Sequence, residues 1–301
     1  MNKIAIVIPY YKIDFFEETL QSVAKQTDQR FTLYIGNDAS PDNPLPLIKK
    51  YLGHVSYFYY DYKENLGGKN LTLQWERILG NVKEDWVQIL GDDDTIAENF
   101  VEEFYKLLTE VEAKNIKLIK CGFYWIDEHT TQIENNVYKF DEIAPTDLFI
   151  KKYKGEIRSS LSENIYKTKL LKEKKFIKLP LAWGTDDLSL ITISENKNIK
   201  YIPKHLINVR VTGKSISGSK EHERTKQIAV QELKKKIILD FYHQFPTDFI
   251  RQVITDYIEA AHYKNVPIDE RILLFYLKKG ELISFLKVAK KIYYIKKKYA
   301  Q

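Results

Sequence analysis

The stretch that most constrains this chain runs from Trp86 to Asp94, where an apolar segment leads directly into three consecutive carboxylates. The apolar part, residues 86–90, ends at a glycine and predicts a strand that is buried on both faces. Asp92, Asp93 and Asp94 repel one another, so burying them requires a counter-charge. A divalent cation with oxygen ligands would supply that charge, whereas a solvated acidic turn would explain the same residues without a metal.

The 301 residues are enough for one large or two modest domains. Hydrophobic residues make up 44% and charged residues 29%, which is typical of a globular protein in water. The single cysteine, Cys121, excludes an internal disulfide and fits a reducing compartment. No segment reaches the ~18 apolar residues of a membrane span, and the start at Met1 lacks the features of a signal peptide. We therefore expect a cytoplasmic protein.

Strand and helix patterns alternate before and around the acidic stretch. Apolar runs predict strands at residues 4–8, 31–36, 55–60, 86–90 and 118–126. Amphipathic segments between them predict helices, the first with a capping box from Asp14 to Glu17. This alternation favours a parallel sheet whose carboxyl ends share one edge. Asp38 would then lie at the same edge as the three aspartates, although the segment 37–43 also fits a simple turn.

A glycine pair opens the helix that is predicted after the third strand. The segment Asn65-Leu66-Gly67-Gly68 lets the backbone approach a phosphate or another backbone closely. It is not a P-loop, because the required Gly-x-x-x-x-Gly-Lys-Ser/Thr pattern is absent.

Five short motifs occur in a fixed order over about the first hundred residues. They are Ile6-Val7-Ile8-Pro9-Tyr10-Tyr11, Leu20-Gln21-Ser22-Val23 with Gln26-Thr27, Gly36-Asn37-Asp38-Ala39-Ser40-Pro41-Asp42, Glu64-Asn65-Leu66-Gly67 and Leu90-Gly91-Asp92-Asp93-Asp94. Together they resemble the inverting family-2 glycosyltransferases. The resemblance implies the GT-A fold, an α/β architecture with a Rossmann-like mixed sheet.

The resemblance also implies a donor-binding set, in which Asp38 accepts a hydrogen bond from a uracil ring. The other members would be Pro9, Tyr10, Tyr11, Asn65, Gly67 and Asp92. The three aspartates correspond to the DxD-type motif, which holds Mn²⁺ or Mg²⁺ against the diphosphate. Because Gly91 stands where the family often has an aspartate, we assign the metal first to Asp93. Asp92 would lie nearer the ribose, and Asp94 is the third candidate ligand.

A second acidic pair, Asp186 and Asp187, follows Trp183-Gly184 and precedes an apolar helical pattern. Acidic residues at a helix N-terminus are favoured by the helix dipole, so capping alone would explain the pair. The resemblance implies instead that Asp187 is the general base, with Asp186 where the family usually has glutamate. Partial desolvation by Trp183 would raise the pKa of such a carboxylate toward the useful range.

The segment Val209–Ser219 follows a short strand predicted at residues 201–203. In the family it corresponds to a flexible loop that closes over the diphosphate, and its glycines would allow hinge motion. Arg210 or Lys214 would then pair with phosphate oxygens. A linker between domains explains the composition equally well.

Beyond residue 222 the pattern is helical, and the last helix has a basic character. Its apolar side is predicted from Leu282 through Leu286 to Tyr293, and residues 281–301 contain six lysines and one glutamate. A basic amphipathic helix can lie on an anionic membrane surface, whereas a solvated lysine face on a packed helix is the simpler explanation.

We therefore predict a GT-A domain over residues 1–218 and a helical C-terminal region over residues 219–301. The expected activity is inverting, metal-dependent transfer of a sugar from a nucleotide diphosphate donor, expected to be UDP-linked. The acceptor would be a hydroxyl of a glycan or lipid-linked glycan in cell-surface polysaccharide synthesis. The alternatives are a non-catalytic sugar-nucleotide or glycan-binding protein and a nucleotidyltransferase. Nucleic acid is not an expected partner, because no recognised module for it is present.

Overall fold

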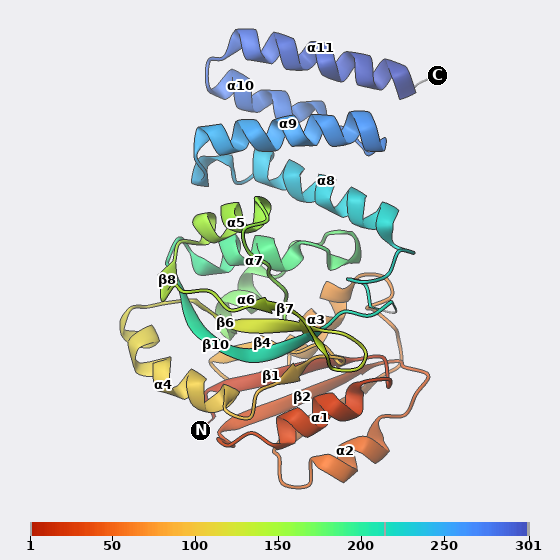
Figure 1. Cartoon of the computed structure of the whole chain (residues 1–301), viewed down its shortest axis with the longest axis vertical. Helices are drawn as coiled ribbons and strands as arrows, with labels where there is room; N and C mark the ends of the chain where they lie inside the picture. The colour runs from red at the N-terminus through yellow and green to blue at the C-terminus, as the bar shows by residue number, and fades with distance from the viewer. Residues whose placement is uncertain (1, 214, 300–301) are drawn as a thin grey trace. The chain divides into compact units, whose positions relative to one another are not determined.

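The computed structural model describes residues 2–213 and 215–299 (Figure 1). The chain forms two compact units, described separately below. Unit 1 comprises Met1–Lys178 and Asp186–Ser219, and unit 2 comprises Leu179–Thr185 and Lys220–Gln301.

Unit 1 is built on a ten-stranded sheet, in which eight strands follow the order β3-β2-β1-β4-β9-β6-β10-β5. The other two, β7 and β8, pair with β6 and β10 respectively. The strands are β1 (Ile4–Tyr10), β2 (Phe31–Asp38), β3 (Tyr57–Tyr62), β4 (Trp86–Ile89), β5 (Thr95–Ile96), β6 (Leu118–Ile126), β7 (Gln132–Asn136), β8 (Glu142–Ile143), β9 (Asn164–Lys167) and β10 (Ile199–Arg210). Strands β3, β2, β1 and β4 are parallel, and β9 runs antiparallel to its neighbours β4 and β6. The predicted mixed α/β sheet is thus confirmed.

Helices cover both faces of this sheet (Figure 1). They are α1 (Phe16–Ala24), α2 (Leu45–Tyr51), α3 (Leu71–Leu79), α4 (Phe100–Ala113), α5 (Pro145–Tyr153), α6 (Thr168–Lys174) and α7 (Thr185–Ser194). Alternate residues of β1, Ile4, Ile6 and Ile8, join a buried core with α1, α2 and α4. Helix α3 contacts β1 and β2, and α6 contacts β9. The Trp75 ring of α3 meets edge to face the ring of Phe176, which follows α6.

Two local predictions differ from the structure. Helix α1 begins at Phe16 and its N-cap residue, Phe15, makes no side-chain cap, so the capping box predicted at Asp14 is wrong. The short strand predicted at residues 201–203 is part of the twelve-residue β10. Irregular pairing between β10 and β6 after Ile202 accommodates Pro203, since a bulge tolerates a residue without an N–H.

Unit 2 is helical, as predicted for this region. It contains α8 (Glu223–Leu239), α9 (Thr247–Lys264), α10 (Leu274–Lys278), α11 (Leu282–Tyr299) and the 3-10 helices η1 (Pro180–Ala182), η2 (Tyr242–Gln244) and η3 (Glu270–Leu273). Its core is formed where α8 meets α9. Helix α11 buries Ile292 and Ile295, whereas Leu282, Leu286 and Tyr293 of its predicted apolar side are exposed. No helix among the described residues is long and apolar enough to cross a membrane.

Candidate active site

The predicted donor residues meet at one edge of the sheet because they follow parallel, neighbouring strands. Tyr10 pairs in register with Asn37, and Val7 pairs with Ile89 of the adjacent strand. The chain therefore leaves β1, β2 and β4 on the same side, which is where open α/β sheets bind ligands.

Asp92 joins the acidic stretch to the loop after β1. Its Oδ2 accepts hydrogen bonds from the backbone amides of Tyr11 (2.7 Å) and Lys12 (2.8 Å). Burial, together with the charge of Asp93, raises the pKa of Asp92 to about 7. This carboxylate thus holds the β1 loop against the end of β4.

Asp94 is buried and contacts two other parts of unit 1. Its Oδ2 accepts a hydrogen bond from the Ser162 hydroxyl, and its Oδ1 accepts one from the Arg210 amide (2.9 Å). Burial, followed by the charge of Asp93, raises its pKa to about 8. These contacts give Asp94 a supporting role that ties β4 to β10.

Asp93 differs from its two neighbours. Within residues 2–213 and 215–299, no other residue donates a hydrogen bond to its carboxylate. Its side chain is half-buried, and burial raises its pKa. A carboxylate that is crowded by two others and not committed to protein donors fits a hard divalent cation. Of the three, Asp93 is the best candidate ligand.

A side chain at position 91 would crowd this turn. A Cβ at position 91 would lie 2.8 Å from Oδ2 of Asp94 and 3.0 Å from Oδ1 of Asp93. A longer side chain would crowd both carboxylates. With the side chains as they lie here, glycine fits position 91 without displacing either carboxylate.

Asp38 anchors the glycine-containing loop before α3. It accepts hydrogen bonds from the amides of Leu66 (2.9 Å) and Gly67 (2.7 Å), and from the Arg77 guanidinium (2.5 Å). A Cβ at Gly67 would lie only 2.6 Å from Oδ2 of Asp38, so glycine is needed for this approach. Asn65 closes the same loop by accepting a hydrogen bond from Gly68 (2.5 Å). Sequence inspection missed Arg77, which occurs in an ordinary helical pattern.

The residues at the end of β1 divide into buried and exposed groups. Tyr10 is fully buried, packs 4.4 Å from the Phe16 ring and donates a hydrogen bond to the Asp42 carbonyl (3.1 Å). Its ring is therefore not available to a ligand, and Tyr10 acts only by fixing, together with Pro9, the backbone at the end of β1. Tyr11 is 39% exposed beside Asp92, so its ring is available to a ligand.

The environment of Arg210 differs from the one expected for a residue that contacts phosphate. Its side chain is buried, its guanidinium pairs with Glu18 (2.5 Å), and it donates to the carbonyls of Asp93 (3.1 Å) and Asp127 (2.9 Å). It lies over the Phe15 ring at 4.2 Å. This arrangement favours support of the acidic turn over phosphate binding. Lys214 lies outside the described residues.

The second acidic pair lies in the first turn of α7. Asp187 is buried and accepts a hydrogen bond from the Lys152 ammonium, whose nitrogen is 3.8 Å from Asp186. Burial raises the pKa of Asp187 to about 6, although the charge of Lys152 opposes the shift. For Lys152 the two carboxylates outweigh burial and raise its pKa. The pair thus combines an ion pair with a carboxylate that titrates near neutrality.

A second buried ion pair lies close enough to influence Asp187. Lys120 donates to Glu163 (2.5 Å), Ser159 (2.9 Å) and Asn164 (3.0 Å), and its charge lowers the pKa of Asp187. Oε2 of Glu163 is buried and has no hydrogen-bond partner among the described residues. Neither Lys120 nor Lys152 was predicted as a site residue. For Lys120, the available signal was its position as a lysine inside the apolar strand predicted at residues 118–126.

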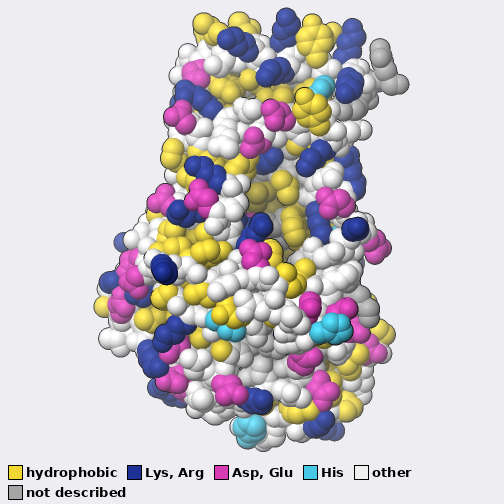
Figure 2. Space-filling model, in the orientation of Figure 1, with side chains coloured by type: hydrophobic (Ala, Val, Ile, Leu, Met, Phe, Trp, Pro, Cys, Tyr) yellow, Lys and Arg dark blue, Asp and Glu magenta, His cyan; other side chains and the backbone are white. Residues whose placement is uncertain are grey.

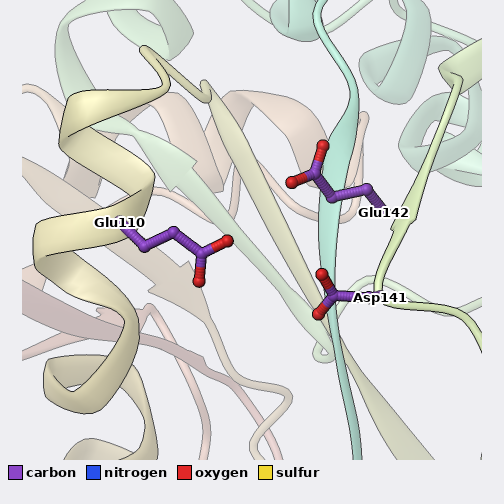
Figure 3. A group of neighbouring side chains, drawn as sticks. All are labelled: Glu110, Asp141 and Glu142. Carbon is purple, nitrogen blue, oxygen red and sulfur yellow. The ribbon is translucent and has the colours of Figure 1, made fainter.

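Another acidic cluster, Glu110, Asp141 and Glu142, brings its carboxylate oxygens within 4.8 Å of one another (Figure 3). Lysine ammonium groups already neutralise it. Lys200 lies 2.8 Å from Glu110 and 2.7 Å from Asp141, and Lys114 lies 2.7 Å from Glu110 and 2.5 Å from Glu142. We therefore assign no metal to this cluster.

Comparison with known proteins identifies the class. The family model "Glycosyl transferase family 2" matches residues 5–180, which is more than half of the chain. The chain therefore belongs to glycosyltransferase family 2, and the resemblance inferred from the five motifs is confirmed.

Among curated relatives, the chain is similar to the glycosyltransferases GlyA and GlyG of Streptococcus pneumoniae serotype 4. The identity is 26% over 184 residues for GlyA and 25% over 130 residues for GlyG. These matches cover 61% and 42% of this chain, but only 24% of GlyA and 40% of GlyG. The chain thus aligns with less than half the length of either relative.

Solved structures agree on the fold. TarS 1-349 of S. aureus, in complex with UDP-GlcNAc, superimposes with a TM-score of 0.59 at 17% identity, covering 96% of this chain and 91% of that one. The mannosyltransferase PcManGT of Pyrobaculum calidifontis, in complex with GDP-Man and Mn²⁺, gives 0.54 at 11% identity, with coverage of 97% and 84%. The fold is the GT-A type that was predicted.

Proposed function

We propose that this chain transfers a sugar from a nucleotide diphosphate donor to a hydroxyl of a glycan, with inversion at the anomeric carbon. The observation that carries the proposal is the buried Asp187, whose pKa of about 6 suits a general base near neutral pH. Family membership supports the reaction class. A cytoplasmic role in polysaccharide synthesis is the setting we infer for such a transfer.

The donor would bind at the edge formed by β1, β2 and β4. We assign the nucleoside to the region of Asp38, Tyr11 and the loop from Asn65 to Gly67, because the Tyr11 ring is exposed and Asp38 holds this loop through the Gly67 amide. UDP is the proposed donor nucleotide, because TarS, which shares the fold, binds UDP and UDP-GlcNAc. PcManGT binds GDP-Man, so GDP is the competing donor nucleotide.

Asp93 would hold Mn²⁺ or Mg²⁺, with Asp92 and Asp94 fixing the turn that presents it. When bound, such an ion supplies positive charge to the departing diphosphate. PcManGT is known with Mn²⁺, which supports a metal in this fold.

Asp187 would take the proton from the acceptor hydroxyl as that oxygen forms its bond to the anomeric carbon. The bond between this carbon and the diphosphate oxygen breaks on the opposite side, and the nucleotide diphosphate leaves with the electron pair. Lys152 would keep the carboxylate ionised and fixed in direction before the attack. Asp186, 3.8 Å from the same ammonium, would contribute charge rather than accept the proton.

The direct test compares Asp187→Asn with the wild type. Loss of the base should lower transfer by roughly 10²–10⁴-fold, measured as nucleotide diphosphate released from a panel of UDP- and GDP-sugars with glycan acceptors. Donor binding should remain, because Asp187 is not among the proposed donor contacts. Asp186→Asn serves as the matched control and should retain most activity.

The same experiment separates the competing functions. A binding protein would release no nucleotide from any donor in the wild type. A nucleotidyltransferase would release pyrophosphate from a nucleoside triphosphate instead. If Asp186→Asn abolished transfer while Asp187→Asn did not, the base would have to be reassigned to Asp186.

A further inference from the structure

Helix α11 presents large apolar side chains to solvent. Five of them are more than half exposed: Leu282 (63%), Ile283 (73%), Leu286 (65%), Tyr293 (63%) and Tyr294 (58%). At 3.6 residues per turn these positions lie within about 120° of the helix circumference. Scattered exposed apolar residues are ordinary, but five on one face of one helix mark an interaction surface.

Lysines interrupt this apolar face and no acidic residue does. From Leu282 to Tyr299 the helix contains six lysines and neither aspartate nor glutamate. Lys287 and Lys290 are exposed, and by helical spacing Lys290 falls within the apolar arc. Figure 2 shows hydrophobic and basic side chains side by side over this helix, which Figure 1 labels. We call this surface the α11 face.

We propose that the α11 face binds the surface of an anionic lipid bilayer. Lysine side chains can extend their ammonium groups to lipid phosphates while their methylene stems stay among apolar neighbours. Tyrosines such as Tyr293 and Tyr294 suit the boundary between headgroups and acyl chains, because each ring is apolar with a polar tip. The helix would lie in the plane of the interface.

Charge decides between a bilayer and a second copy of this chain. Two copies joined through the α11 face would bring lysines against lysines, which costs free energy unless anions intervene. An anionic bilayer pairs each lysine with a phosphate and also accepts the apolar side chains between them. The proposal goes beyond sugar transfer, since binding to a bilayer requires neither donor nor acceptor.

The test is co-sedimentation of the whole chain with large vesicles at low salt. We expect binding to vesicles of phosphatidylcholine that contain phosphatidylglycerol, little binding to pure phosphatidylcholine, and weaker binding as salt is raised. Absence of binding to the anionic vesicles at low salt would overturn the proposal.

Variants locate the contact. Lys287→Gln with Lys290→Gln should weaken partition onto anionic vesicles roughly thirtyfold, which corresponds to about 1 kcal/mol for each lysine. The matched control, Lys139→Gln with Lys178→Gln, removes two exposed lysines of unit 1 and should change binding by less than about threefold. An equal loss in both variants would mean attraction by net charge alone and would contradict the α11 face.

Removal of apolar side chains tests the other half of the surface. Ile283→Ser with Leu286→Ser should also weaken vesicle binding while leaving the thermal midpoint unchanged, because both residues are exposed. If the wild type instead forms dimers without vesicles and this variant is monomeric by light scattering, the face joins two copies and the bilayer proposal fails.

Discussion

Asp187 is subject to opposing effects, and their balance sets its proposed role. Burial favours the neutral carboxyl, while Lys152 and the more distant Lys120 favour the ionised form. The result is a pKa of about 6, so the carboxylate is ionised at neutral pH yet still basic enough to accept a proton. Lys152 is therefore a positioning residue, since it acts on the substrate only through Asp187.

Lys152→Met should move the acid limb of the kcat/KM profile to higher pH. In the wild type the rate should fall as the pH drops through about 6, because the base must be deprotonated. Without the lysine charge the pKa of Asp187 rises, so the loss of activity begins at higher pH. The measurement is kcat/KM from about pH 5 to 9.

Lys151→Met is the control, because Lys151 pairs with Glu156 at the surface and does not contact Asp187. Its profile should match that of the wild type. A Lys152→Met enzyme that loses activity equally at every pH, with its acid limb unmoved, would show that Lys152 has only a structural or binding role.

Among the elements, β10 has the largest unexpected role. It supplies the amide that binds Asp94 and the guanidinium that binds the Asp93 carbonyl. The acidic turn after β4 is thus held by a strand more than a hundred residues later in the chain. This strand, rather than a mobile loop, contains Arg210.

Arg210→Met should therefore lower stability more than donor affinity. Loss of the buried guanidinium removes its hydrogen bonds to the carbonyls of Asp93 and Asp127 and its pairing to Glu18, so the free energy of unfolding should fall by about 1–3 kcal/mol in urea titration. Arg158→Met, which alters a half-exposed arginine, should have little effect. A large loss of UDP affinity at unchanged stability would restore the phosphate-contact prediction.

The sequence revealed the elements whose pattern is local. The strand predicted at residues 118–126 has those bounds in the structure, because a buried strand is a continuous apolar run. The extent of β10 escaped detection, since Pro203 and two charged residues interrupt its pattern and only pairing with β6 reveals it. The sequence likewise marked three aspartates and a second acidic pair. It did not show which carboxylate is committed to protein donors, because Ser162 and Arg210 come from distant segments.

At the scale of the whole molecule, the proposed chemistry and the proposed membrane contact belong to different units. The acidic turn, the donor edge and Asp187 lie in unit 1, whereas α11 lies in unit 2. A chain organised in this way can lose one property and keep the other. Variants of the α11 face should thus leave transfer to a soluble acceptor unchanged, which separates the two proposals experimentally.

The most direct test of the central claim is thermal unfolding against UDP, GDP and other nucleoside diphosphates, each with Mn²⁺ and with EDTA. A ligand that binds only the folded state stabilises it by about 2.7 kcal/mol at a hundredfold excess over its dissociation constant. We predict a rise in Tm with UDP and Mn²⁺ that disappears in EDTA and in Asp93→Ala. A shift with GDP alone would contradict the uracil role of Asp38, and no shift with any nucleotide would contradict the donor site itself.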